Sequence, residues 1–362
     1  MKVLFIARAT LYSSPGGDTR QLDETAHNLL KLGIDVDVAL TNTQPDYRAY
    51  DLLHFFNIIR PADILRHSRR AGKPYVVSTI YVQYGAADRV ARGGLAGAIG
   101  RMLNEDGMEW VKAVARMLKN GERLPLRYFL IGHRQAVQEV AKGAAMLLPN
   151  SASEYRRFVA AYDIERPHCV VPNGVNLADV RRHYNPLPAY EGAVLCMGRI
   201  EARKNQLRLI EALNNTALRV FIHGRPSPNA VGYANACAEA AASNIQILPP
   251  ITGATLYAAY ASAKVHVLPS YFETTGLSSL EAAAMGCNIV VTDRGDTRDY
   301  FGDRAWYCDP DDPASIRGAV EAAHAAPYDE KFRAHILKNY TWQRAGEETL
   351  AAYEAVLSGR VK

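Results

Sequence analysis

The sequence has no apolar run that approaches the roughly 18 residues of a membrane-spanning helix. Its five cysteines are scattered, odd in number and without the spacing of a metal site, which is typical of small core residues in a reducing compartment. The first ten residues, MKVLFIARAT, have a strand pattern and lack the cleavage region of a signal peptide. These absences argue against a membrane-spanning or disulfide-stapled chain, and we expect a cytoplasmic protein.

Several motifs of cofactor and metal sites are missing as well. The turn after the first expected strand is Gly-Gly and not the G-x-G-x-x-G of a dinucleotide site, which argues against NAD. The acidic sequence DVD at 35–37 falls inside an expected strand, so we interpret it as sheet and not as metal ligands. Aromatic and basic residues are not interleaved as they are on nucleic-acid-binding surfaces. We therefore expect no metal, no bound cofactor and no nucleic-acid partner.

Charge is unevenly distributed along a chain that is otherwise typical of globular proteins. The formal net charge is +5, yet residues 60–134 hold fourteen Lys and Arg against six Asp and Glu, a net charge of +8. Such a basic region suggests an anionic surface or ligand, although a solvated basic face is the alternative. Within it, residues 109–125 predict a basic amphipathic helix with Trp110, Val114, Met117 and Leu118 on one face. This helix either contacts an anionic membrane surface or packs on its own domain.

Apolar β-branched runs alternate with helical patterns from end to end, which predicts parallel sheets covered by helices. The alternation restarts after a polar stretch at 173–192, so the fold class expected is α/β with two Rossmann-like, doubly wound parallel-sheet domains facing a central cleft. The expected domains are 1–180 and 181–340, with a closing helix at 341–362. In the first half the strands are expected at 2–8, 51–57, 74–80, 144–150 and 168–172, together with DVDVAL.

Ligands of open parallel sheets bind beyond the carboxyl ends of the strands. The loop after the first strand contains Gly16 and Gly17 and precedes a helix. Two glycines let backbone N–H groups approach an oxyanion, and the helix N-terminus adds a partial positive charge. A plain turn is the competing interpretation of this pattern.

The first strand of the second half is followed by MGRIEARKNQ. It places Arg199 and Lys204 five residues apart, beside Gly198. An arginine fork and a lysine point charge at a strand end suit a diphosphate. Two ordinary surface charges on a solvated loop are the alternative.

The stretch ETTGLSSLEAAAMG, at 273–286, joins an expected strand to an expected helix. Ser278 or Ser279 is expected to cap that helix, whose free N–H groups could bind phosphate. Glu273 lies in the loop and Glu281 inside the helix, and carboxylates accept well from paired hydroxyls. We interpret the pair as bracketing a sugar nucleotide, one carboxylate for each sugar ring. For Glu281 alone, a helix-dipole glutamate is the competing interpretation.

Taken together, these motifs resemble the group 1 (family 4) retaining glycosyltransferases of the GT-B fold. The resemblance also includes DLLHFFN at 51–57, VVPNGVN at 170–176 and the closing YTWQRAGEETLAAYEAVL. It implies an acceptor-binding N-terminal domain, a C-terminal domain that binds a nucleotide-diphosphate sugar, and a closing helix that packs back on the first domain. It also implies a metal-independent transferase that retains anomeric configuration, with no cofactor beyond the sugar nucleotide.

The resemblance assigns roles to residues of this sequence. Arg199 and Lys204 match the pair that stabilises the departing diphosphate. Glu273 matches the glutamate at the donor sugar, and Glu281 the one at the ribose. The remaining donor contacts it implies are Gly16, Gly17, Gly198, Gly276, Leu277 and Ser278. Two further residues are expected to contact the sugar or acceptor, Tyr81 and Asn173.

One position departs from the family pattern. Members commonly carry a histidine in the N-terminal domain, where this chain has VVSTIYVQYG at 76–85, so that Ile80 or Tyr81 occupies the position. A tyrosine hydroxyl could donate to the sugar but would be a poor base at neutral pH. His54 lies in an earlier strand and matches a different family element. The fine mechanism and the choice of donor are therefore open.

The function expected is transfer of a sugar from a nucleotide-diphosphate sugar to a glycan or lipid-linked glycan acceptor, in bacterial surface polysaccharide or glycoconjugate biosynthesis. An anionic membrane surface, contacted through 109–125, would place the protein peripherally on the inner face of the cell membrane. Two alternatives stay open: a non-catalytic protein of this fold that binds sugar nucleotides or glycans, and a sugar-nucleotide epimerase of the same fold.

Overall fold

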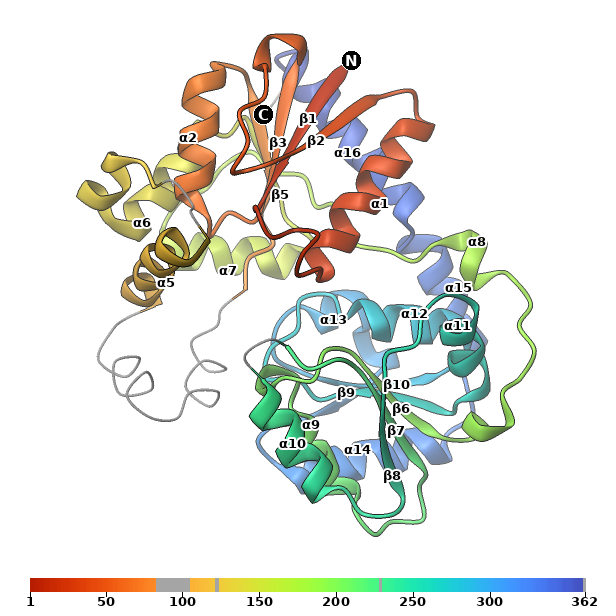
Figure 1. The fold of residues 1–362 in the computed structure, drawn as a ribbon. Coiled ribbons are helices and arrows are strands. Elements are labelled where there is room, and N and C mark those ends of the chain that lie inside the picture. Colours follow the sequence, from red (N-terminus) through yellow and green to blue (C-terminus); the bar gives the residue numbers. More distant parts are fainter. Residues whose placement is uncertain (83–104, 121–123, 228–229, 361–362) are drawn as a thin grey trace. The chain divides into compact units, whose positions relative to one another are not determined.

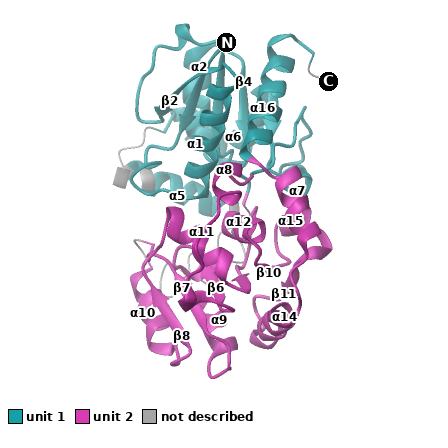
Figure 2. Cartoon of the chain, turned by 90° about the vertical axis from the view of Figure 1, so that its right-hand side faces the viewer, with its two compact units in different colours: residues 1–81, 94–173, 342–362 teal, residues 82–93, 174–341 magenta. Residues whose placement is uncertain are grey.

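The computed structural model describes residues 1–82, 105–120, 124–227 and 230–360 (Figure 1). The chain forms two compact units, coloured separately in Figure 2. The first unit comprises residues 1–81, 94–173 and 342–362, and the second comprises residues 82–93 and 174–341. Each unit is built around its own parallel sheet.

The first unit contains a five-stranded sheet in the order β2-β1-β3-β4-β5, and every strand pairing in it is parallel. Its strands are β1 (Lys2–Ala7), β2 (Asp35–Leu40), β3 (Leu52–Phe56), β4 (Tyr75–Ser78) and β5 (Met146–Leu148). The segment 168–172, expected as a strand, is not one: it runs beside β5 with an isolated bridge between Leu147 and His168 and with hydrogen bonds from Cys169 to Leu147 and from Val171 to Pro149. Strand β3 is buried throughout, as a parallel strand with helices on both faces should be.

Helices cover the sheet of the first unit. They are α1 (Gly17–Lys31), α2 (Pro61–Ala71), α5 (Glu105–Asn120), α6 (Leu126–Gly143), α7 (Ala152–Tyr162) and α16 (Trp342–Leu357). Helix α16 packs against α1, so the expectation that the closing helix returns to the first domain is confirmed (Figure 1). Gly346 permits this approach, since a Cβ there would lie 2.8 Å from the Cβ of Asn28. Farther along α16, the Tyr353 hydroxyl lies 2.6 Å from Nδ1 of His54.

The second unit contains a six-stranded parallel sheet in the order β11-β10-β9-β6-β7-β8. Its strands are β6 (Val194–Met197), β7 (Val220–His223), β8 (Ile245–Leu248), β9 (Val265–Leu268), β10 (Asn288–Thr292) and β11 (Trp306–Cys308). The α-helices are α8 (Leu177–Val180), α9 (Gln206–Leu213), α10 (Val231–Ala240), α11 (Gly253–Ser262), α12 (Leu277–Met285), α13 (Thr297–Phe301), α14 (Pro313–Ala325) and α15 (Glu330–Asn339).

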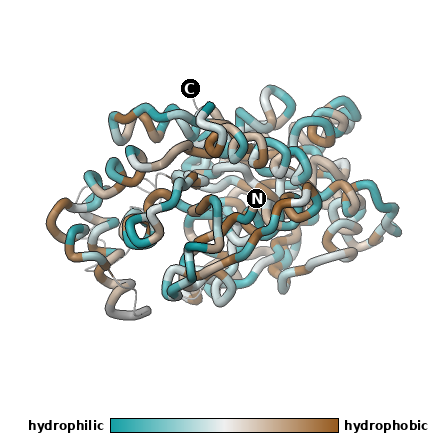
Figure 3. Tube along the Cα trace, turned by 90° about the horizontal axis from the view of Figure 1, so that it is seen from above, coloured by the Kyte–Doolittle hydropathy of each residue, from teal (hydrophilic) through white to brown (hydrophobic). Residues whose placement is uncertain are grey.

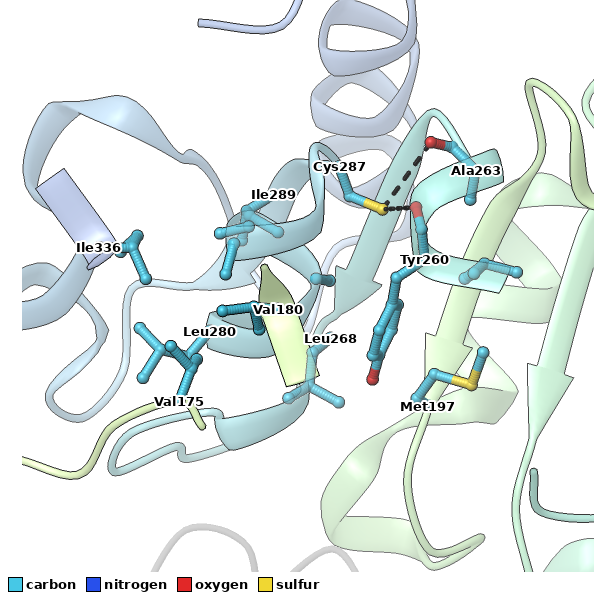
Figure 4. Packing of buried hydrophobic residues seen from close by; sticks show 14 of the residues in the cluster. Val175, Val180, Met197, Tyr260, Ala263, Leu268, Leu280, Cys287, Ile289 and Ile336 are labelled. Atoms are coloured by element: carbon cyan, nitrogen blue, oxygen red, sulfur yellow. Dashed lines mark hydrogen bonds between the residues drawn. The ribbon is translucent and has the colours of Figure 1, made fainter. Parts of the chain in front are cut away.

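The core of the second unit lies on both faces of its sheet. Alternate residues of β6 enter different clusters: Leu195 packs with the residues of α11, α12 and α15, whereas Val194 packs with those of α9 and α14. Figure 4 shows part of the first cluster, in which the buried Cys287 thiol donates to the carbonyl of Tyr260 at 3.1 Å. All five cysteines are free thiols; four are buried, as expected for small core residues, and Cys169 is half-buried.

Hydrophobic residues are distributed along the trace in short stretches interrupted by hydrophilic ones (Figure 3). Across the described ranges, no helix combines the length and the apolar character that crossing a membrane requires.

Parallel pairing brings several loops of the second unit to one edge of its sheet. Strand β9 lies between β6 and β10, and all three run in the same direction. The loops that follow them, at 198–205, 269–276 and 293–296, are therefore neighbours at the carboxyl edge. This is the edge at which open α/β sheets bind ligands.

Candidate active site

An ion pair joins two of these loops. Nζ of Lys204 donates to Oε2 of Glu273 at 2.7 Å, and the two side chains are only 14% and 8% exposed. Ser270 donates to the same carboxylate oxygen at 3.0 Å. Burial raises the pKa of the Glu273 carboxyl, but the charges of Lys204 and Arg203 and the two hydrogen bonds outweigh burial and hold the pKa below its ordinary value. Glu273 is therefore an anion at neutral pH.

Arg199 lies in the same loop as Lys204 and is differently placed. Its side chain is 42% exposed, and its Nη2 lies 3.9 Å from Oε1 of Glu201. Glu201 is held more firmly by two other groups: Arg203 donates to it at 3.0 Å and the Ser227 hydroxyl at 2.5 Å. Burial raises the pKa of Glu201, and the charges of Arg203 and Arg199 lower it further than burial raises it. The loop thus presents one loosely held guanidinium beside a fixed carboxylate.

Helix α12 begins in this loop region at Gly276, its N-cap, which has a left-handed backbone (φ +68°). No side chain caps the helix, so the expectation that Ser278 or Ser279 would do so is wrong. The Ser279 hydroxyl instead lies 3.2 Å from Nδ1 of His266 in the core, whereas Leu277 and Ser278 are half-buried. The first amide that the helix satisfies is that of Leu280, which donates to Gly276 at 2.9 Å, so the N–H groups before it lack helical partners.

Glu281 is the fifth residue of α12 and therefore lies in the second turn, not beside the loop. Its side chain is half-buried, and its charge contributes, after burial, to raising the pKa of the Tyr260 hydroxyl on α11. The two glutamates thus differ in surroundings: Glu273 is fixed by a lysine in the loop, and Glu281 lies in the second turn of α12, where its charge acts on Tyr260 of α11.

Two glycines outside the predicted set shape the site. The backbone of Glu273 pairs with the loop after β10: its N–H donates to Arg294, and its carbonyl accepts from Asp296 at 2.9 Å. A Cβ on Gly295 (φ +115°) would lie 1.9 Å from the Glu273 carbonyl oxygen. Likewise, a Cβ on Gly224 would lie 2.0 Å from the carbonyl oxygen of Gly198. Sequence reasoning missed both positions; the available signal was an isolated glycine at the end of a strand run.

In the first unit, the predicted glycine loop is organised by an arginine that sequence reasoning also missed. Arg8 follows β1 and donates to both carboxylate oxygens of Asp18, at 2.5 and 3.1 Å. It donates further to the backbone carbonyls of Thr10 and Ser14. Gly16 is the N-cap of α1 and donates its N–H to the Thr19 hydroxyl at 3.0 Å, while Gly17 begins the helix and is exposed.

The position that lacks the family histidine is under backbone strain. Ile80 has a φ of +43°, which β-branched residues rarely adopt, and its side chain is half-buried. Tyr81 is buried, with its ring against Phe158 and Tyr162. The fully buried Glu154 fixes the turn, because it accepts the N–H of Tyr81 at 2.8 Å and the hydroxyl of Thr79.

His54 does not replace the missing histidine in the first unit. Its Nδ1 lies 2.6 Å from the Tyr353 hydroxyl and its Nε2 lies 2.8 Å from the Ser78 hydroxyl, so both ring nitrogens are bonded within the core. Burial lowers the pKa of this imidazole to about 3, which keeps it neutral. Asn173, predicted to contact the sugar or acceptor, is also buried.

The structure therefore brings part of the predicted set together within the second unit: Gly198, Arg199, Lys204, Glu273 and the start of α12 share the carboxyl edge of the sheet. The loosely held Arg199 and the fixed Lys204, together with the first N–H groups of α12, can neutralise phosphate oxygens. In the part of the chain that the structure describes, no group of three or more His, Cys, Asp or Glu side chains is arranged to hold a metal.

Comparison with known proteins places this site in a family. The model of the "Glycosyl transferases group 1" family matches residues 191–325, which include the Lys204–Glu273 pair. The D-inositol 3-phosphate glycosyltransferase of Geodermatophilus obscurus is 31% identical over 262 residues, covering 65% of this chain and 57% of that protein. The one of Pseudarthrobacter chlorophenolicus is 26% identical over 384 residues, covering 100% and 87%. The chain thus matches little more than half the length of the first relative and most of the second.

Solved structures show the same fold. Sucrose-phosphate synthase from Thermosynechococcus elongatus superposes with a TM-score of 0.73 at 15% identity and covers 99% of this chain and 100% of that one. The Anabaena protein HepE, in complex with UDP and glucose, superposes with a TM-score of 0.67 at 13% identity and covers 98% and 100%. These likenesses confirm the GT-B fold class. Residues 191–325, which carry the candidate site, thus match the group 1 glycosyltransferase family, and the chain as a whole has the GT-B fold.

Proposed function

We propose that the protein transfers a sugar from a nucleotide-diphosphate sugar with retention of anomeric configuration and without a metal ion. The observation that carries the proposal is that Arg199 and the buried Lys204–Glu273 pair lie in neighbouring loops at the carboxyl edge where α12 begins. In this proposal Gly276, Leu277 and Ser278 offer backbone N–H groups to the donor.

The chemical demand of the reaction matches these charges. As the glycosidic bond to the diphosphate breaks, negative charge grows on the leaving oxygen and positive charge on the sugar ring. Preorganised cations and N–H groups stabilise the leaving group, at about 3 kcal/mol for each donor lost. Arg199 is loosely held and half exposed, so it can turn to the diphosphate, whereas Lys204 is fixed. A same-face substitution follows, in which a diphosphate oxygen accepts the proton of the attacking hydroxyl.

The donor and the acceptor are proposed from relatives and from the sequence. A structural neighbour is solved with UDP and glucose, which supports a uridine-type donor as the first to test. We propose Glu281 for the ribose, and Gly16 and Gly17 for the donor from the first unit. Tyr81 and Asn173 remain proposed sugar or acceptor contacts, reachable only if the buried side chains move. The acceptor is a glycan or lipid-linked glycan, with inositol phosphate as the alternative that the relatives' names suggest.

The first experiment identifies the donor. A panel of UDP-, GDP-, ADP- and dTDP-sugars is screened by thermal shift, since a bound donor raises the apparent stability by mass action. The sugar nucleotide that stabilises the protein is then used in turnover assays with glycan, lipid-linked and inositol phosphate acceptors. The anomeric configuration of the product is determined by NMR.

The outcomes separate the candidate functions. Transfer with retention supports the proposal. Donor binding without hydrolysis or transfer would show a non-catalytic binding protein, and a changed donor sugar without any acceptor would show an epimerase. Inversion of the anomeric centre, or no binding of any sugar nucleotide, would contradict the proposal.

We further propose peripheral contact with the inner face of a bacterial cell membrane, in polysaccharide or glycoconjugate biosynthesis. Within the predicted 109–125 segment, α5 is described to residue 120, and the side chains of Arg116 and Lys119 lie outside the described residues. Support comes from the neighbouring α6, where Leu126 and Leu130, one turn apart, are 77% and 78% exposed. Binding to anionic liposomes that is lost in the Leu126→Ser/Leu130→Ser variant would support contact; no binding at low salt would contradict it.

A further inference from the structure

The residue after Lys204 has an unusual conformation for a buried side chain. Asn205 is 2% exposed and has a left-handed backbone (φ +62°, ψ +31°) between the short turn that carries Lys204 and the start of α9. Asparagine tolerates this region better than most residues, but glycine adopts it at less cost. The backbone alone therefore does not explain why an amide side chain stands here.

The Asn205 amide joins three loops of the second unit. Its Nδ2 donates to the carbonyl of Pro269, directly after β9, at 3.1 Å, and to the carbonyl of Pro310, after β11, at 2.7 Å. The backbone reinforces the first connection, since the N–H of Tyr271 donates to the carbonyl of Arg203 at 3.0 Å. The Lys204 turn is thus fastened to the segment that contains Glu273 at two points, one on each side of Lys204.

We infer that Asn205 is a positioning residue for the Lys204–Glu273 pair. Both N–H bonds of one amide nitrogen end on loops that follow other strands, so the direction in which Lys204 leaves the backbone is set by the whole sheet edge and not by its own turn. Without these bonds, the backbone of the turn is joined to the segment after β9 only by the Tyr271–Arg203 bond among the described contacts, and the ammonium moves relative to the carboxylate. Buried carbonyls left without a donor add to the cost.

The test uses glycine, which keeps the left-handed backbone and removes the amide. Asn205→Gly is compared with Asn215→Gly, because Asn215 is also left-handed (φ +57°) but is exposed in another loop. Lys204 is labelled with acetic anhydride in the folded proteins, and its rate is measured by mass spectrometry against the other lysines. We expect faster labelling of Lys204 in Asn205→Gly and no change in Asn215→Gly.

A second experiment measures turnover. It rests on the proposed function and is independent of the labelling experiment. With a donor that native protein turns over, Asn205→Gly should lower kcat about 10- to 100-fold with little change in KM, because a small displacement of a charged group costs mostly in the transition state. If the native protein turns over no donor, the proposed function fails while the labelling result still decides on Asn205.

A third variant keeps the inference falsifiable if Asn205→Gly does not fold. Asn205→Asp has the same size and tolerates the same backbone, but it has no N–H to donate to Pro269 and Pro310. It should also expose Lys204 to faster labelling. Unchanged labelling of Lys204 in the folded Asn205 variant would overturn the inference, whatever the effect on overall stability.

Discussion

Lys204 and Glu273, 69 positions apart in the chain, form a 2.7 Å ion pair at the carboxyl edge of the second sheet. Each had been assigned from the sequence to a different part of a sugar nucleotide. The structure shows that they are partners of each other, so the carboxylate fixes the lysine and the lysine keeps the carboxylate ionised.

The first prediction concerns the energy of this pair. Lys204→Met leaves the Glu273 carboxylate buried without its cation and should destabilise the second unit by about 3 kcal/mol. Glu273→Gln should cost less, because Lys204 reaches solvent more easily. The double variant should recover most of the loss. Urea unfolding of all four proteins measures the coupling; strict additivity would show that the pair contributes nothing as a pair.

The second prediction separates catalysis from stability at Arg199. Its side chain is 42% exposed and its Nη2 lies 3.9 Å from Glu201, so Arg199→Ala should change the free energy of unfolding by less than about 1 kcal/mol. Turnover should fall about 100-fold or more, since one stabilising donor is lost. Arg208→Ala is the matched control, because Arg208 is similarly exposed and paired with Glu211 on α9. Equal turnover of the two variants would remove Arg199 from the site.

A third prediction concerns acid stability through His266. Burial, and then the charge of Lys204, lowers the pKa of this imidazole to about 3, and its Nε2 is buried without a hydrogen-bond partner among the described residues. At a pH below 6.5, the ordinary pKa of histidine, this imidazole binds a proton in the unfolded chain but stays neutral in the folded chain. The free energy of unfolding therefore falls as the pH falls towards 3. The slope from one such group approaches about 1.4 kcal/mol per pH unit.

His266→Phe removes the titrating imidazole. The free energy of unfolding should then fall less steeply between pH 6 and pH 4, and the difference in slope should correspond to the uptake of about one proton on unfolding. His54 is neutral for the same reason and keeps its own contribution in the variant, so the decline should not vanish. Urea midpoints at a series of pH values give both slopes. Parallel curves for the native protein and His266→Phe would show that His266 is already protonated in the folded state.

The fourth prediction tests the approach of two loops at Gly295. Gly295→Ala would place a Cβ 1.9 Å from the Glu273 carbonyl oxygen, so the loop must move and the Lys204–Glu273 pair with it. Gly253→Ala is the control: Gly253 is also left-handed (φ +57°), but nothing lies within 4 Å of its Cβ position. The control should cost about 1–2 kcal/mol from the backbone alone. Calorimetry should show a larger loss of stability for Gly295→Ala than for Gly253→Ala. Equal losses would mean that the loop moves away from the Glu273 carbonyl at no cost.

Much of the fold was predictable, because buried parallel strands appear as short β-branched runs between helical patterns. The strands expected at 2–8, 51–57 and 74–80 all contain strands of the structure. The prediction failed at 168–172, where the run CVVP lies beside β5 but extends past its end: Cys169 donates to Leu147, and Val171 donates to Pro149, which follows the strand. Strand propensity describes a residue's fit to a sheet and not how far the partner strand extends.

The candidate site was predictable at the level of which loops carry charge, and less so at the level of contacts. The serines of α12 were expected to cap the helix, but Gly276 occupies the N-cap in a left-handed conformation that serine adopts poorly. Asn205 and Gly295 were missed because their importance depends on carbonyls from distant loops. The assigned roles of Arg199, Lys204 and Glu273 in transfer remain predictions until donors are tested.

The return of α16 to α1 has a consequence for biosynthesis. Residues 174–341 of the second unit form one continuous range that is translated before Trp342. Until residues 342–357 emerge, the first unit lacks the helix that covers Asn28 and bonds His54. A ribosome-bound chain should therefore complete its later half first, leaving the earlier half exposed to chaperones until α16 has emerged.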